Sequence, residues 1–209
     1  MQRSDGFHTF PSPGGHLCGL AWDGSHLWHS YGTANRIYRI DRSSGEVLGD
    51  IACDNVRTCL AFDGRFLWQI AGTPKRIRVI DPDGGRTMRE IELPEDAESV
   101  CALTIDDHSY WLGSKTTGIV QRRDRTTHAV MRTLQTQGSV HGLAIAGNVL
   151  WYTDYPASAL VAMEINSQRE FFRRELPGHP TGLCSDGERL WYCDYTHQAI
   201  VALDLRASE

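Results

Sequence analysis

Long apolar runs are missing from this sequence of 209 residues, whose apolar stretches are only a few residues long. A membrane-spanning helix needs about 20 consecutive apolar residues, so no membrane partner is expected. The N-terminal segment, Met1 to Phe10, also lacks the apolar core of a secretion signal and carries Arg3 and Asp5. These absences predict a protein that is not secreted and resides in the cytoplasm.

An excess of basic residues is missing as well. The chain has 21 lysines and arginines against 26 aspartates and glutamates, for a formal net charge of -5. Nucleic-acid-binding proteins usually present a basic face to phosphates, so nucleic acid is not an expected partner. Hydrophobic residues at 41% and charged residues at 22% are typical of globular proteins, and the length fits a single domain, residues 1–209.

Several motifs of enzyme chemistry are also absent. The sequence has no glycine-rich phosphate loop, no nucleophile elbow and no zinc-protease motif. Its six cysteines are spread along the chain without a CxxC pair, which favours reduced, buried thiols.

What the sequence does contain is a repeat. A phrase like Gly-Leu-Ala returns five times, and each copy is followed by a strand with a tryptophan. The leucines of the phrase stand at positions 20, 60, 103, 143 and 183, so the period is 40 to 43 residues. A propeller blade of four strands needs about 40 to 45 residues. The predicted fold class is therefore all-β, a five-bladed β-propeller of four-stranded antiparallel blades.

The turns and the tryptophans agree with this unit. Asp23-Gly24, Asp63-Gly64 and Asp186-Gly187 stand between the first and second strands, where a tight hairpin needs residues that tolerate positive φ. Tryptophan recurs at one position of the unit, as expected of large side chains that fill the space between blades. The five are Trp28, Trp68, Trp111, Trp151 and Trp191.

The two ends of the chain predict how the ring closes. The fifth repeat stops after its third strand, Ala199–Leu203, whereas an extra strand, Phe7–Pro11, precedes the first repeat. We expect this N-terminal strand to complete the last blade, which leaves no open edge. The blades follow one another without long insertions, which favours a monomer or a weak dimer.

The repeat also resembles known families. The phrase Gly-Leu-Ala-Trp-Asp-Gly-Ser-His-Leu-Trp at residues 19–28, followed by Asn35–Asp41 and Ser44–Val47, resembles NHL-type propellers, streptogramin lyases and the plant and bacterial type of glutaminyl cyclase. The resemblance covers nearly the whole chain and implies the propeller fold. These families include a magnesium-dependent lyase, a cyclase acting on N-terminal glutamine and non-catalytic interaction modules. Where the cyclases have Phe-Thr-Gln-Gly-Leu, this chain has His16-Leu17-Cys18-Gly19-Leu20.

Ligands of propellers usually meet the mouth of the central channel, and departures from strict repetition are informative there. The third position after the tryptophan is Tyr31 in the first repeat, Asp154 in the fourth and Asp194 in the fifth. Each aspartate is followed by a tyrosine, Tyr155 or Tyr195. We predict catalytic roles for Asp154, Asp194 and Tyr195. Tyr31 and Tyr155 are predicted to bind the ligand, the alternative being that the tyrosines pack between blades.

Histidines depart from repetition in the same three blades. His16, His141 and His179 stand just before or at the inner strands of the first, fourth and fifth repeats, which become neighbours when the ring closes. We predict His141 as a catalytic acid or base, and all three as ligands of one divalent metal ion, either Mg, Zn or Cu. The alternative is that these histidines bond to loop backbones at the rim.

The other side of the mouth is predicted to be basic. Arg57 and Lys115 are placed to hold a carboxylate or another anion of a ligand. Cys18 and Cys101 share their inner-strand position with His141 and are predicted to bind ligand, either as holders of a soft metal or with one thiol as nucleophile. Small buried side chains around a narrow axis are the alternative.

Together these residues predict a small-molecule enzyme of lyase, cyclase or hydrolase type that acts at the channel mouth with His and Asp groups, with or without a metal. The alternative is a non-catalytic propeller whose rim binds a peptide, sugar or protein partner. Clustering of the unusual residues in three blades favours the enzyme, because a repeat lectin or scaffold usually keeps equivalent binding residues in most blades.

Overall fold

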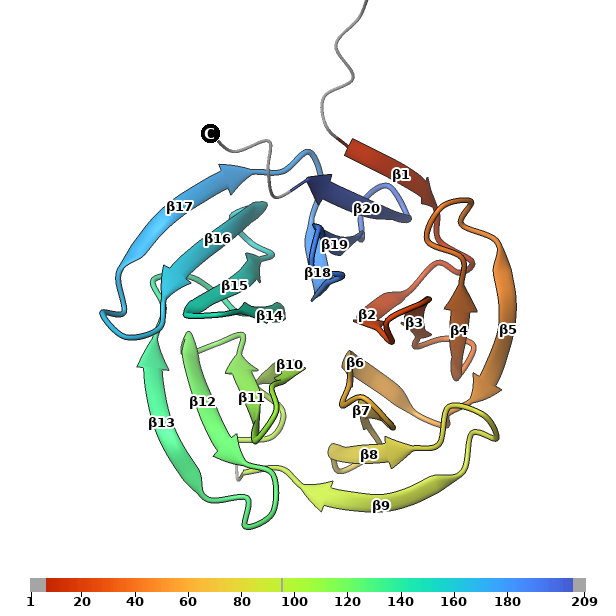
Figure 1. Cartoon of the computed structure of the whole chain (residues 1–209), viewed down its shortest axis with the longest axis horizontal. Helices are drawn as coiled ribbons and strands as arrows, with labels where there is room; N and C mark the ends of the chain where they lie inside the picture. Colours follow the sequence, from red (N-terminus) through yellow and green to blue (C-terminus); the bar gives the residue numbers. More distant parts are fainter. Residues whose placement is uncertain (1–6, 95, 205–209) are drawn as a thin grey trace, which may run out of the picture.

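The computed structural model describes residues 7–94 and 96–204. Within these ranges, 20 strands form five antiparallel sheets of four strands each. Figure 1 shows the sheets as blades of a ring around a central channel. The predicted five-bladed propeller is confirmed. None of these residues forms a helix long and apolar enough to cross a membrane.

Each blade places one strand at the channel and three strands successively further out. Blade 1 consists of β2 (Leu17–Trp22), β3 (Leu27–Tyr31), β4 (Arg36–Ile40) and β5 (Val47–Ala52). Blade 2 consists of β6 (Val56–Phe62), β7 (Leu67–Ala71), β8 (Arg76–Ile80) and β9 (Thr87–Glu92). Blade 3 consists of β10 (Val100–Ile105), β11 (Ser109–Ser114), β12 (Ile119–Asp124) and β13 (Val130–Gln135). Blade 4 consists of β14 (Gly142–Ala146), β15 (Val149–Asp154), β16 (Ala159–Glu164) and β17 (Glu170–Glu175).

The fifth blade is completed by the N-terminal strand, as predicted. It consists of β18 (Pro180–Ser185), β19 (Arg189–Asp194), β20 (Ala199–Asp204) and β1 (Phe7–Pro11). In the antiparallel pairing of β1 with β20, Phe10 lies opposite Ile200. The ring is thus closed by joining its two ends. Residues 1–6, 95 and 205–209 lie outside the described residues. The predicted absence of a secretion signal at the N-terminus and the predicted single domain over residues 1–209 therefore remain predictions.

The Asp-Gly phrases form the hairpins between the first and second strands. Gly24, Gly64 and Gly187 have φ values of 97°, 90° and 89°, which glycine adopts without steric cost. In blade 2 the Asp63 Oδ1 accepts hydrogen bonds from the backbone N–H groups of Arg65 at 2.9 Å and Phe66 at 2.7 Å. The aspartate therefore folds the turn through its side chain.

The same aspartates anchor the repeated tryptophans. In four blades the second carboxylate oxygen accepts the indole N–H of the tryptophan five residues later, at 2.7 to 2.9 Å. The pairs are Asp23–Trp28, Asp63–Trp68, Asp106–Trp111 and Asp186–Trp191. Blade 4 has Ala146 instead, and its Trp151 packs on Phe172 with ring centroids 5.5 Å apart. One residue type thus fixes both the hairpin and the large side chain beside it.

Repetition gives the channel two different ends. The inner strands β2, β6, β10, β14 and β18 surround the channel in Figure 1, and their shared place in the unit makes them run in one direction. We call the end where these strands begin the mouth, and the end with the Asp-Gly hairpins the base. The loops between second and third strands also lie at the mouth, so two loops of every blade meet there.

Candidate functional site

A cavity of about 220 Å³ lies at the mouth and receives side chains from all five blades. At about 30 Å³ per water, it has room for about seven waters, which suits a small molecule. The lining residues are His16, Leu17, Cys18, Arg57, Thr58, Cys101, Lys115, His141, Tyr155, Thr181 and Tyr195. Eight residues that the sequence singled out therefore share one cavity: His16, Cys18, Arg57, Cys101, Lys115, His141, Tyr155 and Tyr195.

One repeated position of the inner strand supplies part of this lining. In the five blades it is occupied by Cys18, Thr58, Cys101, His141 and Thr181. At or beside it, four inner strands shift their register against the second strand. Such bulges re-aim a side chain out of the regular pairing. They explain how a residue in a closed blade comes to face the channel.

Just below this position, the inner strands of neighbouring blades lie in close backbone contact, and a side chain crosses the channel. A Cβ added to Gly19 would lie 2.2 Å from the Leu60 nitrogen, and one added to Gly182 would lie 2.6 Å from the Gly19 Cα. The Cys59 thiol donates to the His141 carbonyl at 3.3 Å, which links blade 2 to blade 4 across the axis. A ligand therefore enters and leaves the cavity through the mouth.

Blades 4, 5 and 1 give the cavity an aromatic wall. The Tyr155 ring lies between His141 and His179, with centroid distances of 5.1 and 4.8 Å. Tyr195 meets Tyr155 edge-on at 6.2 Å and meets the His16 ring at 5.7 Å. The Tyr195 hydroxyl is also 3.5 Å from His16 Nδ1. This wall offers ring faces and two phenol hydroxyls to a ligand.

His141 is held as a neutral base. Burial lowers the pKa of its imidazole below the usual 6.5, and nearby Lys115 acts in the same direction against opposing contributions from Ser139 and Asp154. The Ser139 hydroxyl donates to the carbonyl of Lys115, and its oxygen lies 3.3 Å from His141 Nδ1. Because that hydroxyl proton is already directed to a carbonyl, the Ser139 oxygen accepts the proton of Nδ1. Nε2, which has no hydrogen-bond partner among the described residues, is left with its lone pair.

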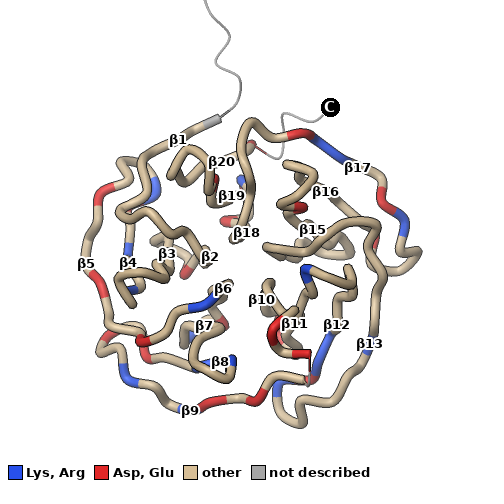
Figure 2. Tube along the Cα trace, turned by 180° about the vertical axis from the view of Figure 1, so that it is seen from behind, with Lys and Arg blue, Asp and Glu red and all other residues tan. Residues whose placement is uncertain are grey.

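Blades 2 and 3 give the cavity a cationic wall. Lys115 forms no ion pair within the described part of the chain, and Arg57 contacts the largely exposed carboxylate of Glu98 at 3.2 Å. Lys75 lies behind them and donates to the carbonyls of Glu98 and Val100 at 2.9 and 3.1 Å. No carboxylate is among the described lining residues. In Figure 2 a blue stretch of β6 lies beside the channel. The cavity thus attracts anions.

The two thiols of the cavity are uncharged near neutral pH. Burial raises the pKa of Cys18 to about 12. Burial also raises the pKa of Cys101, although Lys115 and Lys75 oppose it. Nucleophilic attack and metal binding both need the thiolate, which these surroundings disfavour. Their neighbour Thr58 has a buried hydroxyl oxygen without a hydrogen-bond partner in the described chain, which suits a ligand or a water.

Asp154, Asp194 and Tyr31 lie beneath the rim, outside the cavity lining. Each packs under a glycine in the loop before the inner strand of its own blade. An added Cβ would approach the Asp154 carboxylate within 2.1 Å from Gly138, the Asp194 carboxylate within 2.0 Å from Gly178, and the Tyr31 ring within 2.5 Å from Gly14. Asp194 also binds its own loop, whereas Asp154 contacts Arg173 of β17.

Their polar partners are specific. Asp194 Oδ1 accepts from the backbone N–H groups of Thr196 and His197, and its Oδ2 lies 2.7 Å from His197 Nδ1. Asp154 Oδ2 lies 3.4 Å from the Arg173 guanidinium. The Asp194 carboxylate is therefore occupied by its own loop and the Asp154 carboxylate by a strand arginine, and no direct contact with a cavity ligand is assigned to them.

The three histidines predicted to share a metal ion are kept apart by tyrosines. The Tyr155 ring separates His141 from His179, and His179 Nδ1 contacts the Thr196 hydroxyl at 2.8 Å. Within residues 7–94 and 96–204, no group of three or more His, Cys, Asp or Glu side chains is arranged to hold a metal ion. These residues therefore do not fit a three-histidine metal centre. A metal held in another way stays a prediction.

Ser139, Thr58 and Thr181 were not among the predicted site residues. Thr58 and Thr181 occupy the same position of the repeat as Cys18, so this shared position could have identified them as cavity residues. Ser139 stands two residues before His141, and its role depends on its contacts with the Lys115 carbonyl and with His141 Nδ1.

Comparison with known proteins supports the fold. No protein-family model matches the chain, and no curated protein matches it in sequence. Among solved structures, glutaminyl cyclase of Myxococcus xanthus matches with a TM-score of 0.78 and 12% identity over 94% of each chain. Virginiamycin B lyase of Staphylococcus aureus matches with a TM-score of 0.55 and 19% identity, over 94% of this chain and 68% of the lyase. A chain of a nidogen/laminin complex matches with a TM-score of 0.62 and 18% identity, over 92% of this chain and 77% of the other. The protein is thus a five-bladed β-propeller similar in fold to glutaminyl cyclase and to streptogramin B-type lyases.

Proposed function

We propose that this propeller is a small-molecule enzyme of lyase, cyclase or hydrolase type. It holds an anionic group of its substrate at Lys115 and Arg57 and uses His141 as general base. The observation that carries the proposal is the presence of a neutral histidine with a free Nε2 and an unpaired ammonium group in one blind cavity.

The cavity contains both a group that can accept a proton and a group that can donate one. His141 Nε2 removes a proton from a carbon, hydroxyl or water held between the two walls. The Tyr195 hydroxyl, next to His16, is placed to give a proton to the departing or attacked atom. His141 gains one proton and Tyr195 loses one in each cycle. Exchange of protons with solvent then returns both residues to their starting states.

The charge of the cavity selects the substrate class. The similar structures include a glutaminyl cyclase and a virginiamycin B lyase, so enzymes are known on this fold. A substrate with a free amino group, such as the N-terminal glutamine that the sequence resemblance implies, would meet two cations and no carboxylate among the described lining residues. We therefore expect a carboxylate substrate in preference to an amine.

Binding of benzoate tests this selection. Benzoate is expected to bind the protein saturably, whereas the neutral benzamide and the cationic benzylamine should bind far more weakly. Replacing Lys115 with glutamine should weaken benzoate binding about 10- to 100-fold, because a hydrogen bond to a charged group contributes about 1.5 to 3 kcal/mol. Calorimetric titration measures the affinities.

The matched control is Arg76→Gln, which removes a positive charge from a strand that does not line the cavity. It should leave benzoate affinity unchanged. Equal binding of benzoate and benzylamine, or an unchanged affinity in Lys115→Gln, would contradict an anion site at the mouth. A screen of small carboxylates by NMR for elimination, cyclisation or hydrolysis then seeks the substrate.

A non-catalytic binding module is the second candidate. Large apolar side chains are exposed on the outer strands, among them Met131 at 54% and Phe171 at 52%, and one similar fold comes from a nidogen/laminin complex. A module would bind through its outer rim, so loss of the cavity groups His141 and Lys115 would leave partner binding intact.

A further inference from the structure

A second cavity, of about 350 Å³, lies at the base between blades 2 and 3. Three arginines line it: Arg65 on the Asp-Gly hairpin, Arg89 on β9 and Arg125 on the turn after β12. Its wall also includes one carboxylate, Asp63, and the apolar side chain of Phe66. It opens on the face opposite the mouth, so it is separate from the site described above.

The charges of this cavity do not balance. The Asp63 carboxylate accepts from the Trp68 indole at 2.9 Å and from Arg125 at 2.6 Å, which neutralises that arginine. Arg65 and Arg89 form no ion pair with any carboxylate in the described ranges. Their guanidinium groups lie over the Phe66 and Trp68 rings, 4.8 and 5.3 Å from the centroids. Neither guanidinium forms a hydrogen bond within the described residues, so their N–H groups remain available to an acceptor.

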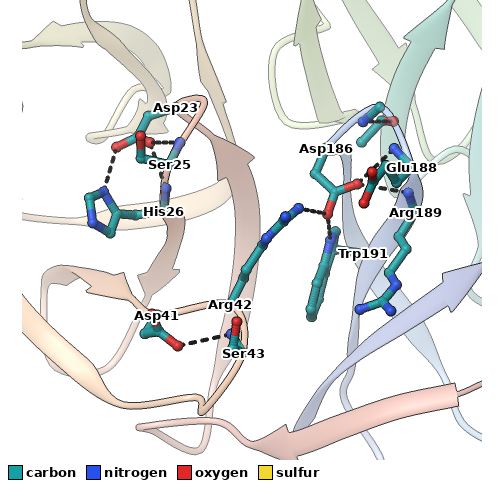
Figure 3. Close-up of polar contacts among 12 residues, drawn as sticks. Asp23, Ser25, His26, Asp41, Arg42, Ser43, Asp186, Glu188, Arg189 and Trp191 are labelled. Carbon is teal, nitrogen blue, oxygen red and sulfur yellow. Dashed lines mark hydrogen bonds and ion pairs between the residues drawn. The ribbon is translucent and has the colours of Figure 1, made fainter.

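The equivalent gap between blades 5 and 1 serves as an internal comparison and is shown in Figure 3. There Arg42 donates to Asp186 at 2.8 Å, as Arg125 does to Asp63. The hairpin position of Arg65 is occupied by Glu188, and the position of Arg89 over the tryptophan is occupied by His8. These two gaps thus share the arginine–aspartate pair, whereas the two additional arginines are present between blades 2 and 3 and absent between the described residues of blades 5 and 1.

We infer that this cavity binds a phosphate-type dianion carried on a small apolar body. Arg65 and Arg89 are exposed, so solvent weakens the repulsion between them, but both attract an anion that enters the cavity they line. Their planar N–H edges match the oxygens of a phosphate in bidentate geometry. Phe66 and Met88, which is 43% exposed, offer apolar contact next to the anion. Two positive charges without a protein partner call for a dianion rather than a simple carboxylate.

Titration with phenyl phosphate, followed by NMR, tests the inference and is independent of the proposed enzyme activity. The wild-type protein is expected to bind phenyl phosphate saturably. Arg65→Gln and Arg89→Gln should each weaken this binding at least 10-fold. Arg86→Gln, a nearby exposed arginine that does not line the cavity, should change nothing. Melting temperatures confirm that each variant is folded.

Lys115→Gln separates the two cavities, because the mouth also attracts anions. If phenyl phosphate occupies the base, its affinity should be unchanged in Lys115→Gln. A loss of binding in Lys115→Gln with full affinity in Arg65→Gln and Arg89→Gln would place the ligand at the mouth and overturn the inference. Absence of saturable binding by the wild-type protein would overturn it as well.

Discussion

Replacing His141 with asparagine is expected to lower kcat for the carboxylate substrate about 100- to 10,000-fold, the range that a general base contributes. Asparagine keeps a planar polar side chain at the cavity but cannot accept the proton. Steady-state kinetics on the substrate found by the screen measures the loss. Because His141 lies at the edge of the inner strand and not in the packed core, the melting temperature should stay close to that of the wild-type protein.

His179→Asn is the matched control for this variant. His179 stacks on the same Tyr155 ring as His141, 4.8 Å away on its other side, but does not line the cavity. Its replacement should change kcat by less than about 10-fold. If both variants lost activity equally, the role of His141 would be to support Tyr155, and the general-base assignment would be wrong.

Replacing Gly19 with alanine is expected to destabilise the fold by about 3 kcal/mol or more, the upper range for overpacking. The new Cβ would lie 2.2 Å from the Leu60 nitrogen and 2.7 Å from the Cys59 carbonyl carbon. Both are backbone atoms of the neighbouring blade, so no side-chain rotation relieves the clash, and the inner strands must move apart. Urea unfolding followed by tryptophan fluorescence gives the change in the free energy of unfolding.

Gly84→Ala provides the comparison for that experiment. No atom lies within 4 Å of a Cβ added at Gly84, which sits in the turn between β8 and β9. This variant should lie within about 0.5 kcal/mol of the wild-type stability. A Gly19→Ala protein as stable as Gly84→Ala would show that the inner strands can separate, and the channel would not be blind.

Repetition explains why so much of the fold follows from the sequence. A period of 40 to 43 residues specifies the blade, and once the blade is known, each residue's place in the unit specifies its place in the ring. The Asp-Gly hairpins and the closing strand Phe7–Pro11 depend on local chemistry and pairing that the sequence displays directly. The same logic brought residues of different blades, such as Lys115 and His141, to one cavity.

Contacts through space were harder to predict. Gly138 and Gly178 leave room for the carboxylates of Asp154 and Asp194, and this relation to a preceding loop is one that no periodicity reveals. The histidines share the mouth, but the Tyr155 ring stands between two of them. Side-chain direction, rather than blade position, decides which groups meet.

The protonation state of His141 tests the central claim most directly. Nitrogen-15 NMR of the imidazoles, with the His141→Asn variant to assign the signal among the nine histidines, gives both tautomer and pKa. We expect the proton on Nδ1, an unprotonated Nε2 and a pKa below 6.5, because burial and Lys115 disfavour the imidazolium. A proton on Nε2, or a pKa at or above 6.5, would contradict a poised base in the cavity.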